Sequence, residues 1–223
     1  HVRVSDKPIK STYLVQNADI ITINNFSFVH KYNCLEGLKE KGKVLLNTVF
    51  GADEVDKVLP DVYKKILQEK KATLFVINAQ KIAESVGLGN KINMVMQTAL
   101  FKTSEIIPYE DAKMQIQKYI KKTFSKKGQK VVEKNLKAVE LTENGIEKVD
   151  INKFTFKGIA FSEKNIPDEF YQKIMKPIEK LEGDNLPVSV FDKSGIIPCG
   201  TAEFEKRGIA AHLPIWLPKN CIQ

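Results

Sequence analysis

The sequence has few cysteines and no long hydrophobic run, and both scarcities restrict what the protein can be. Its three cysteines stand far apart, at Cys34, Cys199 and Cys221, and do not form the disulfide framework of a small secreted domain. No apolar stretch approaches the roughly 20 residues that a membrane-spanning helix needs, and the start shows no signal-peptide pattern. We therefore expect a protein of a reducing compartment that does not enter a membrane.

Catalytic and metal-binding motifs are scarce as well. The three histidines, His1, His30 and His212, are isolated from one another, and the sequence contains neither HExxH nor CxxC. The chain ends in KNCIQ, where Cys221 alone cannot hold an iron–sulfur cluster, although a second cysteine just beyond would open a ferredoxin-type motif. Because the first residue is His1 rather than Met, we expect the chain to be a piece of a longer protein.

What the sequence does contain is basic charge and enough apolar material for a core. The net charge is +8, and 43% of the residues are hydrophobic, which is normal for a globular domain. Residues 113–137 hold nine lysines and one acidic residue, which suits a nucleic acid, an acidic protein or a phosphorylated cofactor. A basic nucleic-acid-binding domain is one alternative. However, the lysines are not interleaved with aromatics and no nucleic-acid signature is present, so we expect no nucleic-acid partner.

Hydrophobic patterning predicts an α/β fold. Two continuous apolar runs, KVLLNTVF (43–50) and TLFVIN (73–78), are typical of buried parallel strands, and residues 11–25 are predicted to form two short strands. Helical patterns separate or follow these strands, at residues 28–42, 53–71, 79–86 and throughout 91–139. The alternation predicts a three-layer domain with a mainly parallel sheet and helices on both faces.

The pattern changes after residue 144. Residues 148–161 (KVDINKFTFKGIAF) alternate apolar and polar side chains, as a half-buried strand does, and residues 167–181 predict a short helix. Beyond Gly183, prolines at 187, 198, 214 and 218 rule out long regular elements. We place the boundary near residue 157, so that residues 1–157 form the α/β domain and residues 158–223 a small linker domain with an extended tail.

The stretch GLGNKINMVMQ (87–97) is the first candidate site. It is not a dinucleotide fingerprint, because that motif needs a third glycine and follows its strand directly. Its glycines nonetheless precede a helix start, where free backbone N–H groups favour an anion. We expect Asn90, Asn93 and Gln97 to share one helix face, with Asn93 one turn inside the helix. The alternative is a glycine helix end followed by an amphipathic helix with a polar outer side.

A second asparagine inside a predicted helix is the other candidate. Asn135 lies between Val131 and Ala138, at the edge of an apolar helix face. Asparagine is unfavourable in a helix interior because its amide competes for nearby backbone groups. A local rule broken at a semi-buried position often marks a functional residue.

Four stretches together resemble one family. DKPIKSTYLVQNADIITINN, GLGNKINMVMQTALFK, KKGQKVVEKNLKAVE and PCGTAEFEKRGIAAHLPIWLPKNCIQ are similar to the central region of pyruvate:ferredoxin (flavodoxin) oxidoreductases, and the resemblance covers essentially the whole chain. The last stretch contains the Glu205-Lys206-Arg207 signature of a small linker domain. The resemblance implies that residues 1–157 are a gamma domain lacking its N-terminal glycine-rich segment. It also implies that residues 158–223 are the EKR linker domain, ending at the first cysteine of a ferredoxin domain.

The resemblance also implies a function. The complete enzyme oxidatively decarboxylates pyruvate to acetyl-CoA and CO2 and reduces ferredoxin or flavodoxin, using thiamine diphosphate, Mg and 4Fe–4S clusters held outside this chain. This piece is expected to bind coenzyme A through Asn93 and Asn135, with Asn90 and Lys91 as further candidates, and to be inactive alone. Cys221 becomes a metal ligand only if the natural chain continues into a ferredoxin domain.

The same resemblance implies a homodimer in the cytoplasm of an anaerobe or in a hydrogenosome-like organelle, whose other domains are the partners of this piece. Two alternatives stay open. In the first, the chain is a purely structural spacer that binds nothing. In the second, it is the same domain from an oxidoreductase for another 2-oxoacid.

Overall fold

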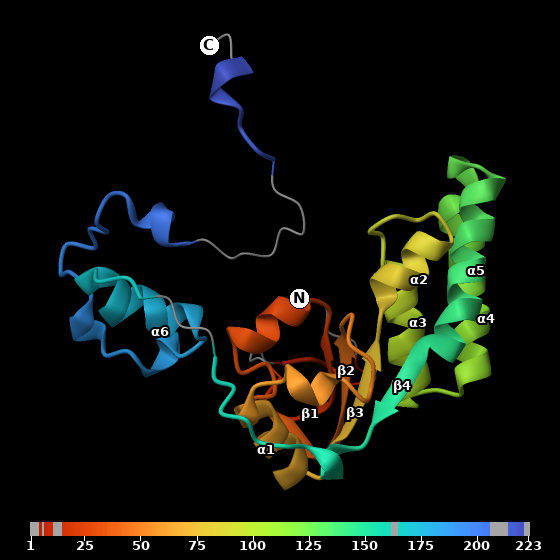
Figure 1. Ribbon diagram of the computed structural model, residues 1–223, viewed down its shortest axis with the longest axis horizontal. Helices are drawn as coiled ribbons and strands as arrows, with labels where there is room; N and C mark the ends of the chain where they lie inside the picture. The colour runs from red at the N-terminus through yellow and green to blue at the C-terminus, as the bar shows by residue number, and fades with distance from the viewer. Residues whose placement is uncertain (1–4, 6, 11–14, 162–164, 206–213, 221–223) are drawn as a thin grey trace.

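The computed structural model describes residues 5, 7–10, 15–161, 165–205 and 214–220, and a four-stranded sheet of order β1-β2-β3-β4 lies at its centre (Figure 1). The strands are β1 (Ala18–Ile23), β2 (Leu38–Asn47), β3 (Thr73–Ile77) and β4 (Ile146–Val149). The first three run parallel, and β4 is antiparallel to β3. The expected mainly parallel sheet is therefore confirmed.

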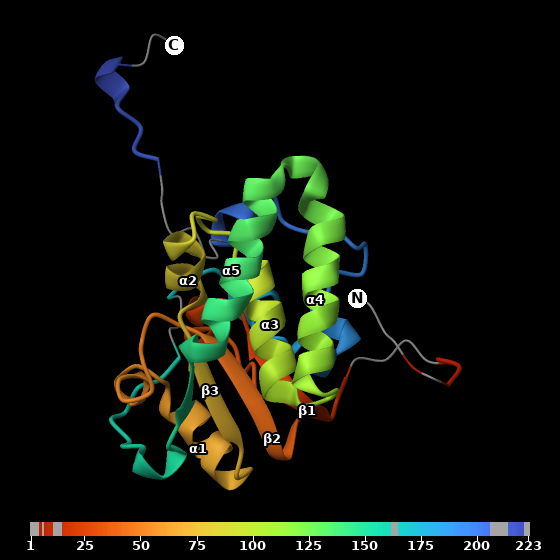
Figure 2. The same cartoon turned by 90° about the vertical axis from the view of Figure 1, so that its right-hand side faces the viewer.

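Helices cover both faces of this sheet, as expected (Figure 2). On one face lies α1 (Asp61–Glu69). On the other lie α2 (Ala79–Ser85), α3 (Asn93–Ser104) and α5 (Gln129–Gly145), with α4 (Tyr109–Phe124) packed against α3 and α5. Short 3-10 helices connect these elements at Phe26–His30, Val55–Lys57, Ser125–Lys127 and Ile151–Lys153.

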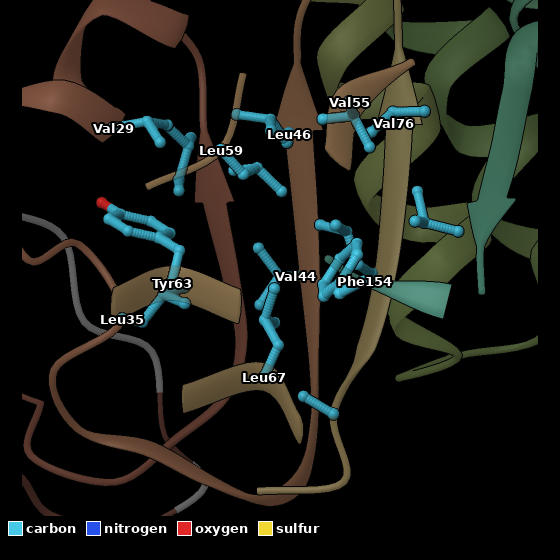
Figure 3. Packing of buried hydrophobic residues seen from close by; sticks show 14 of the residues in the cluster. Val29, Leu35, Val44, Leu46, Val55, Leu59, Tyr63, Leu67, Val76 and Phe154 are labelled. Atoms are coloured by element: carbon cyan, nitrogen blue, oxygen red, sulfur yellow. The ribbon is translucent and has the colours of Figure 1, made fainter. Parts of the chain in front are cut away.

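Alternating side chains of the strands build a core on each face. Val44 and Leu46 of β2 lie in the cluster that Tyr63 of α1 closes (Figure 3), whereas Leu45 between them packs with Val95 of α3. Successive strand residues point to opposite faces of a sheet. The apolar run 43–50 therefore reads as continuous because both faces of β2 are buried.

Two sequence predictions are wrong, both because pairing partners decide where a strand lies. Residues 28–42 were expected to be helical, but β2 begins at Leu38, which pairs with Ala18 of β1. Residues 148–161 were expected to be a strand, but β4 ends at Val149, which pairs with Leu74 near the start of β3. Beyond that point β3 offers no further partner.

Other expectations are met in part. The helix expected at 53–71 forms as a 3-10 turn followed by α1, with Pro60 between them. Of the two strands expected in residues 11–25, the second is β1, and most of the first lies outside the described residues. In the parts of the chain that the structure describes, no helix combines the length and the apolarity that crossing a membrane requires.

A buried lysine of α1 joins the sheet domain to the chain that leaves it. The Lys64 side chain is 0% exposed, and its Nζ lies 3.2 Å from Asp56 Oδ1 and 3.5 Å from Asp61 Oδ1. The same Nζ donates a hydrogen bond of 2.6 Å to the carbonyl oxygen of Thr155. A buried ammonium is tolerated only when it is paired and hydrogen-bonded, and here two carboxylates and one carbonyl provide for it.

The two carboxylates also hold the departing chain. Asp56 accepts hydrogen bonds from the backbone N–H and the hydroxyl of Thr155, and Asp61 accepts from the backbone N–H groups of Lys157 and Gly158. We call Asp56, Asp61, Lys64 and residues 155–158 together the Lys64 clasp. It fixes residues 155–158 against α1 and the turn before it.

Residues 165–205 form a small unit of short turns (Figure 1). A π-helical turn, Tyr171–Met175, runs into α6 (Lys176–Glu179), which confirms the helix expected at 167–181. Tyr171 and Ile174 are the buried residues of this unit. The remaining elements of the unit are 3-10 turns at Gly183–Asn185, Val188–Val190 and Thr201–Phe204, and a further 3-10 turn lies beyond the unit at Pro218–Asn220.

Candidate functional site

The glycines of the candidate stretch form the turn between α2 and α3. Gly87 and Gly89 have φ values of 71° and 59°, a left-handed conformation that favours glycine. The N–H of Leu88 donates to the carbonyl of Ala83 at 2.8 Å, which is the closing bond of a glycine-terminated helix. The local structure is thus a glycine helix end, the alternative that the sequence left open.

The start of α3 follows this turn without a side-chain cap. Ile92 precedes the helix and makes no side-chain hydrogen bond to it. Asn93 is the first residue of α3, not one turn inside as expected, and Asn90 precedes the helix rather than sharing its face. Asn90, Lys91 and Asn93 are all exposed. The first-turn N–H groups, which have no partner within the helix, therefore stand beside two exposed amides and an exposed ammonium group.

Asn135 is placed differently, because α5 buries it. The residue is 5% exposed, and its Nδ2 donates a hydrogen bond of 2.7 Å to the carbonyl of Val131, one turn earlier. Its Oδ1 accepts no hydrogen bond from the described residues. Because this oxygen is not among the buried side-chain atoms that lack a partner, it is open to solvent or to a ligand.

Two lysine bonds show that α3 and α5 run parallel. Near the start of α3, Lys134 of α5 donates a hydrogen bond of 3.0 Å from Nζ to the carbonyl of Gly87. Near the end of α3, Lys102 donates one of 2.7 Å from Nζ to the carbonyl of Glu143. The start of α3 is therefore next to the first half of α5, and the two helix ends are also neighbours.

This parallel packing brings the two predicted asparagines to the same level. Asn93 precedes Lys102 by nine residues, and Asn135 precedes Glu143 by eight. Since both helices rise by about 1.5 Å per residue, Asn93 and Asn135 lie at about the same height along neighbouring helices. The two side chains are not bonded to each other: Asn93 is exposed, and Asn135 donates to Val131 within α5.

Positive charge surrounds this region. Lys91 and Lys130 are exposed and have no ion-pair partner within the described ranges. The Lys134 ammonium lies so close to the turn that a Cβ added at Gly87 would stand 2.9 Å from it. In the sequence, Lys134 is only one of the nine lysines of residues 113–137. The position of Lys134 next to Asn135 was the sequence feature that could have indicated a functional role. No sequence feature indicated its hydrogen bond to Gly87.

Other candidates for chemistry do not gather. Within residues 5, 7–10, 15–161, 165–205 and 214–220, no group of three or more His, Cys, Asp or Glu side chains is arranged to hold a metal ion. Burial raises the pKa of the Cys34 thiol, which disfavours the reactive thiolate. Cys199 is exposed, and Cys221 lies outside the described residues.

The fold and this cluster define a class: an α/β domain with a basic, amide-bearing edge suited to an anionic ligand. Comparison with known families gives a closer assignment. The family model described as pyruvate ferredoxin/flavodoxin oxidoreductase matches residues 1–144, and the chain belongs to that family. A second family model, EKR, described as a domain of unknown function, matches residues 160–210.

Individual relatives agree with this assignment. The chain is 41% identical over 225 residues to a pyruvate:ferredoxin oxidoreductase of Moorella thermoacetica, and 37% identical over 228 residues to a pyruvate-flavodoxin oxidoreductase of Enterobacter agglomerans. Each match covers 100% of this chain but 19% of the relative. A solved pyruvate oxidoreductase subunit of Thermotoga maritima is 23% identical, with a TM-score of 0.46 over 61% of this chain and 67% of that one.

Proposed function

We propose that this chain is the part of a pyruvate:ferredoxin or pyruvate:flavodoxin oxidoreductase that binds coenzyme A and links the catalytic and electron-carrying domains. Asn135 is the observation that carries the proposal, because the Oδ1 of this largely buried residue has no protein partner and is open to a ligand near the uncapped start of α3. Family membership supports the reaction, and the names of the relatives support pyruvate as substrate.

The residues of this region fit the chemistry of coenzyme A. That ligand carries phosphates, amide N–H groups and an adenine ring. Lys91 and Lys134 are suited to neutralise phosphate charge, and the start of α3 offers backbone N–H groups to an anion. The vacant Oδ1 of Asn135 is suited to accept a hydrogen bond from an amide or adenine N–H, and the exposed amides of Asn90 and Asn93 can donate or accept.

The part played by this chain is to hold and position the ligand. When bound, coenzyme A supplies the thiol that takes up the acetyl group. The residues described here bind and neutralise it, and none of them takes a catalytic role. Thiamine diphosphate, Mg and the 4Fe–4S clusters are assigned to the remainder of the oxidoreductase. Cys221 is proposed as a cluster ligand on the condition that the natural chain continues into a ferredoxin domain.

Calorimetric titration with coenzyme A tests the proposal, first with this chain and then with the complete polypeptide that contains it. Asn135→Leu should weaken binding about 5- to 150-fold, since leaving one hydrogen-bonding group of the ligand unpaired costs about 1–3 kcal/mol. Asn144→Leu is the matched control, because Asn144 lies on the same helix more than two turns away, and its affinity should equal that of the parent.

Two outcomes would count against the proposal. Saturable binding that Asn135→Leu leaves unchanged would remove Asn135 from the site. No binding by either the chain or the complete polypeptide would favour the alternative of a purely structural spacer.

A further inference from the structure

An apolar cavity lies where the small unit of residues 165–205 meets the α/β domain. Its volume is about 810 Å³, within the range of about 300–1,000 Å³ that ligand-sized pockets occupy. Phe28, Tyr32 and Cys34 line it from the α/β domain, and the rest of the lining comes from residues 170–205. The cavity is distinct from the start of α3, since it shares no lining residue with residues 86–97 or with α5.

The cavity is bordered by large apolar side chains that remain open to solvent. Leu181, Ile196 and Ile197 are 71%, 71% and 65% exposed, and Ile178 and Phe191 are 48% and 45% exposed. Single exposed apolar residues are common on proteins, but several lining one cavity mark a surface that a partner covers. Within residues 165–205 the buried side chains are Tyr171 and Ile174, so the five residues above remain at the surface.

The charge of the lining is opposite to that of the chain. Glu179, Asp192 and Glu205 line the cavity together with apolar and neutral residues, and no lysine or arginine is among the lining residues. The whole chain carries a net charge of +8. An acidic border in a basic molecule selects a partner with positive charge around its apolar side chains.

The size of the relatives indicates where such a partner resides. The chain aligns over its full length with proteins of which it covers 19%. A polypeptide of that kind has about four-fifths of its residues elsewhere, and those residues are always present at high effective concentration. They are a more consistent occupant of an open apolar surface than a second copy of this chain, which would reach the surface only by free diffusion.

We infer that the cavity between Tyr32 and Ile196 is the docking site for an amphipathic segment from the remainder of the oxidoreductase polypeptide. The apolar side chains of that segment enter the cavity, and its lysine or arginine residues face Asp192 and Glu205. The inference rests on the proposed function only in that this chain is part of a larger oxidoreductase. Because the docked segment touches both parts of the chain, it fixes the small unit of residues 165–205 against the α/β domain.

Hydrogen exchange tests this inference by comparing the 223-residue chain with the complete polypeptide. Amides of residues 174–197 should exchange about tenfold more slowly, or slower still, in the complete polypeptide, because docking covers them. The double variant Ile196→Ser, Ile197→Ser should remove that protection without unfolding the unit, since both side chains are exposed. Val188→Ser is the control, because Val188 is 88% exposed in the same unit but does not line the cavity.

The charge of the partner is tested separately with Glu205→Lys, which should also reduce the protection. Equal exchange in the two proteins, protection that the isoleucine variant keeps, or protection insensitive to Glu205→Lys would each overturn the inference. So would protection in the 223-residue chain that rises with its concentration, which identifies a second copy. Coenzyme A titration of the isoleucine variant and of Glu205→Lys distinguishes the two proposals. Neither variant alters the start of α3, so the affinity for coenzyme A should stay at the parent value in both.

Discussion

Asn135 lies inside a helix, and the two polar atoms of its side chain differ in their hydrogen bonding. Its Nδ2 is satisfied by the carbonyl of Val131, a bond that any asparagine in a helix can make. Its Oδ1 is not satisfied by the described residues. The hydrogen bond from Nδ2 to Val131 is what the Asn135 side chain contributes to the stability of the fold. The oxygen without a protein partner is the reason that we propose Asn135 as a ligand contact.

Asn135→Leu should therefore separate folding from binding. We expect the free energy of unfolding to stay within about 1 kcal/mol of the parent or to rise, because leucine has a higher helix propensity and leaves no buried polar atom unpaired. Urea unfolding monitored by circular dichroism measures this. A loss larger than about 2 kcal/mol would show that the amide is needed for the fold.

Gly87 allows a second comparison at the residue scale. Gly87→Ala should lower the free energy of unfolding by the roughly 1–2 kcal/mol that a left-handed alanine costs, with a small further loss because the new Cβ, 2.9 Å from Lys134 Nζ, displaces that flexible side chain from its hydrogen bond to Gly87. Gly89→Ala is the matched control, with φ of 59° and nothing within 4 Å of the new Cβ. Equal losses in urea unfolding would mean that the Lys134 contact contributes nothing.

At the scale of elements, α1 and the departing chain depend on one buried ammonium. Lys64→Met should lower the free energy of unfolding by about 3 kcal/mol, the lower end of the range for breaking a buried pair, since both carboxylates keep some solvent contact. Lys65→Met is the control: Lys65 lies next in α1, is 70% exposed and is 3.8 Å from Glu69, so the change should be below about 1 kcal/mol. Equal effects in urea unfolding would contradict a special role for Lys64.

The clasp also predicts how stability depends on pH. Burial raises the pKa of Asp56 and Asp61, but hydrogen bonds from residues 155–158 and the Lys64 ammonium outweigh it, so both pKa values lie below the ordinary 3.8. A depressed folded-state pKa gives stability that is present above the unfolded-state pKa and is lost as pH falls through the folded one.

Urea midpoints should accordingly be constant from about pH 7 to 5 and fall below about pH 4. In Asp56→Asn that acid-induced decrease should be smaller, because one of the two shifted carboxyl groups is gone. A variant with the same pH profile as the parent would assign the acid sensitivity to other carboxylates.

At the scale of the whole molecule, stability is unevenly distributed. Leu45 is 0% exposed at the centre of the sheet, whereas Tyr171 and Ile174 are the buried residues of the described part of the 165–205 unit. In the isolated chain, amides of that unit should exchange with solvent faster than those of β2 and β3, because local opening exposes little apolar surface there. Equal exchange rates would mean that the chain opens as one cooperative unit.

The sequence predicted the elements whose signal is local. The apolar runs of β2 and β3 and the helices on both faces are read from neighbouring residues. The start of β2 at Leu38 could not be predicted, because residues 39–42 are mostly polar and have no partner in β1, and the strand is defined there by the pairing of Leu38 with Ala18 and of Lys43 with Ile20. The Lys64 clasp joins residues 91 apart in sequence, so no local pattern indicates it. Asn90, Lys91, Asn93 and Asn135 remain predictions as ligand contacts.

The clasp has a consequence for how this protein can diverge. Asp61 holds the departing chain by the backbone N–H groups of Lys157 and Gly158, and Lys64 holds it by a backbone carbonyl. Such bonds are available to almost any residue other than proline. Only Gly158, with φ of 74°, is restricted by its own backbone. Related sequences can therefore exchange side chains freely at position 157 and still send the chain out in the same direction.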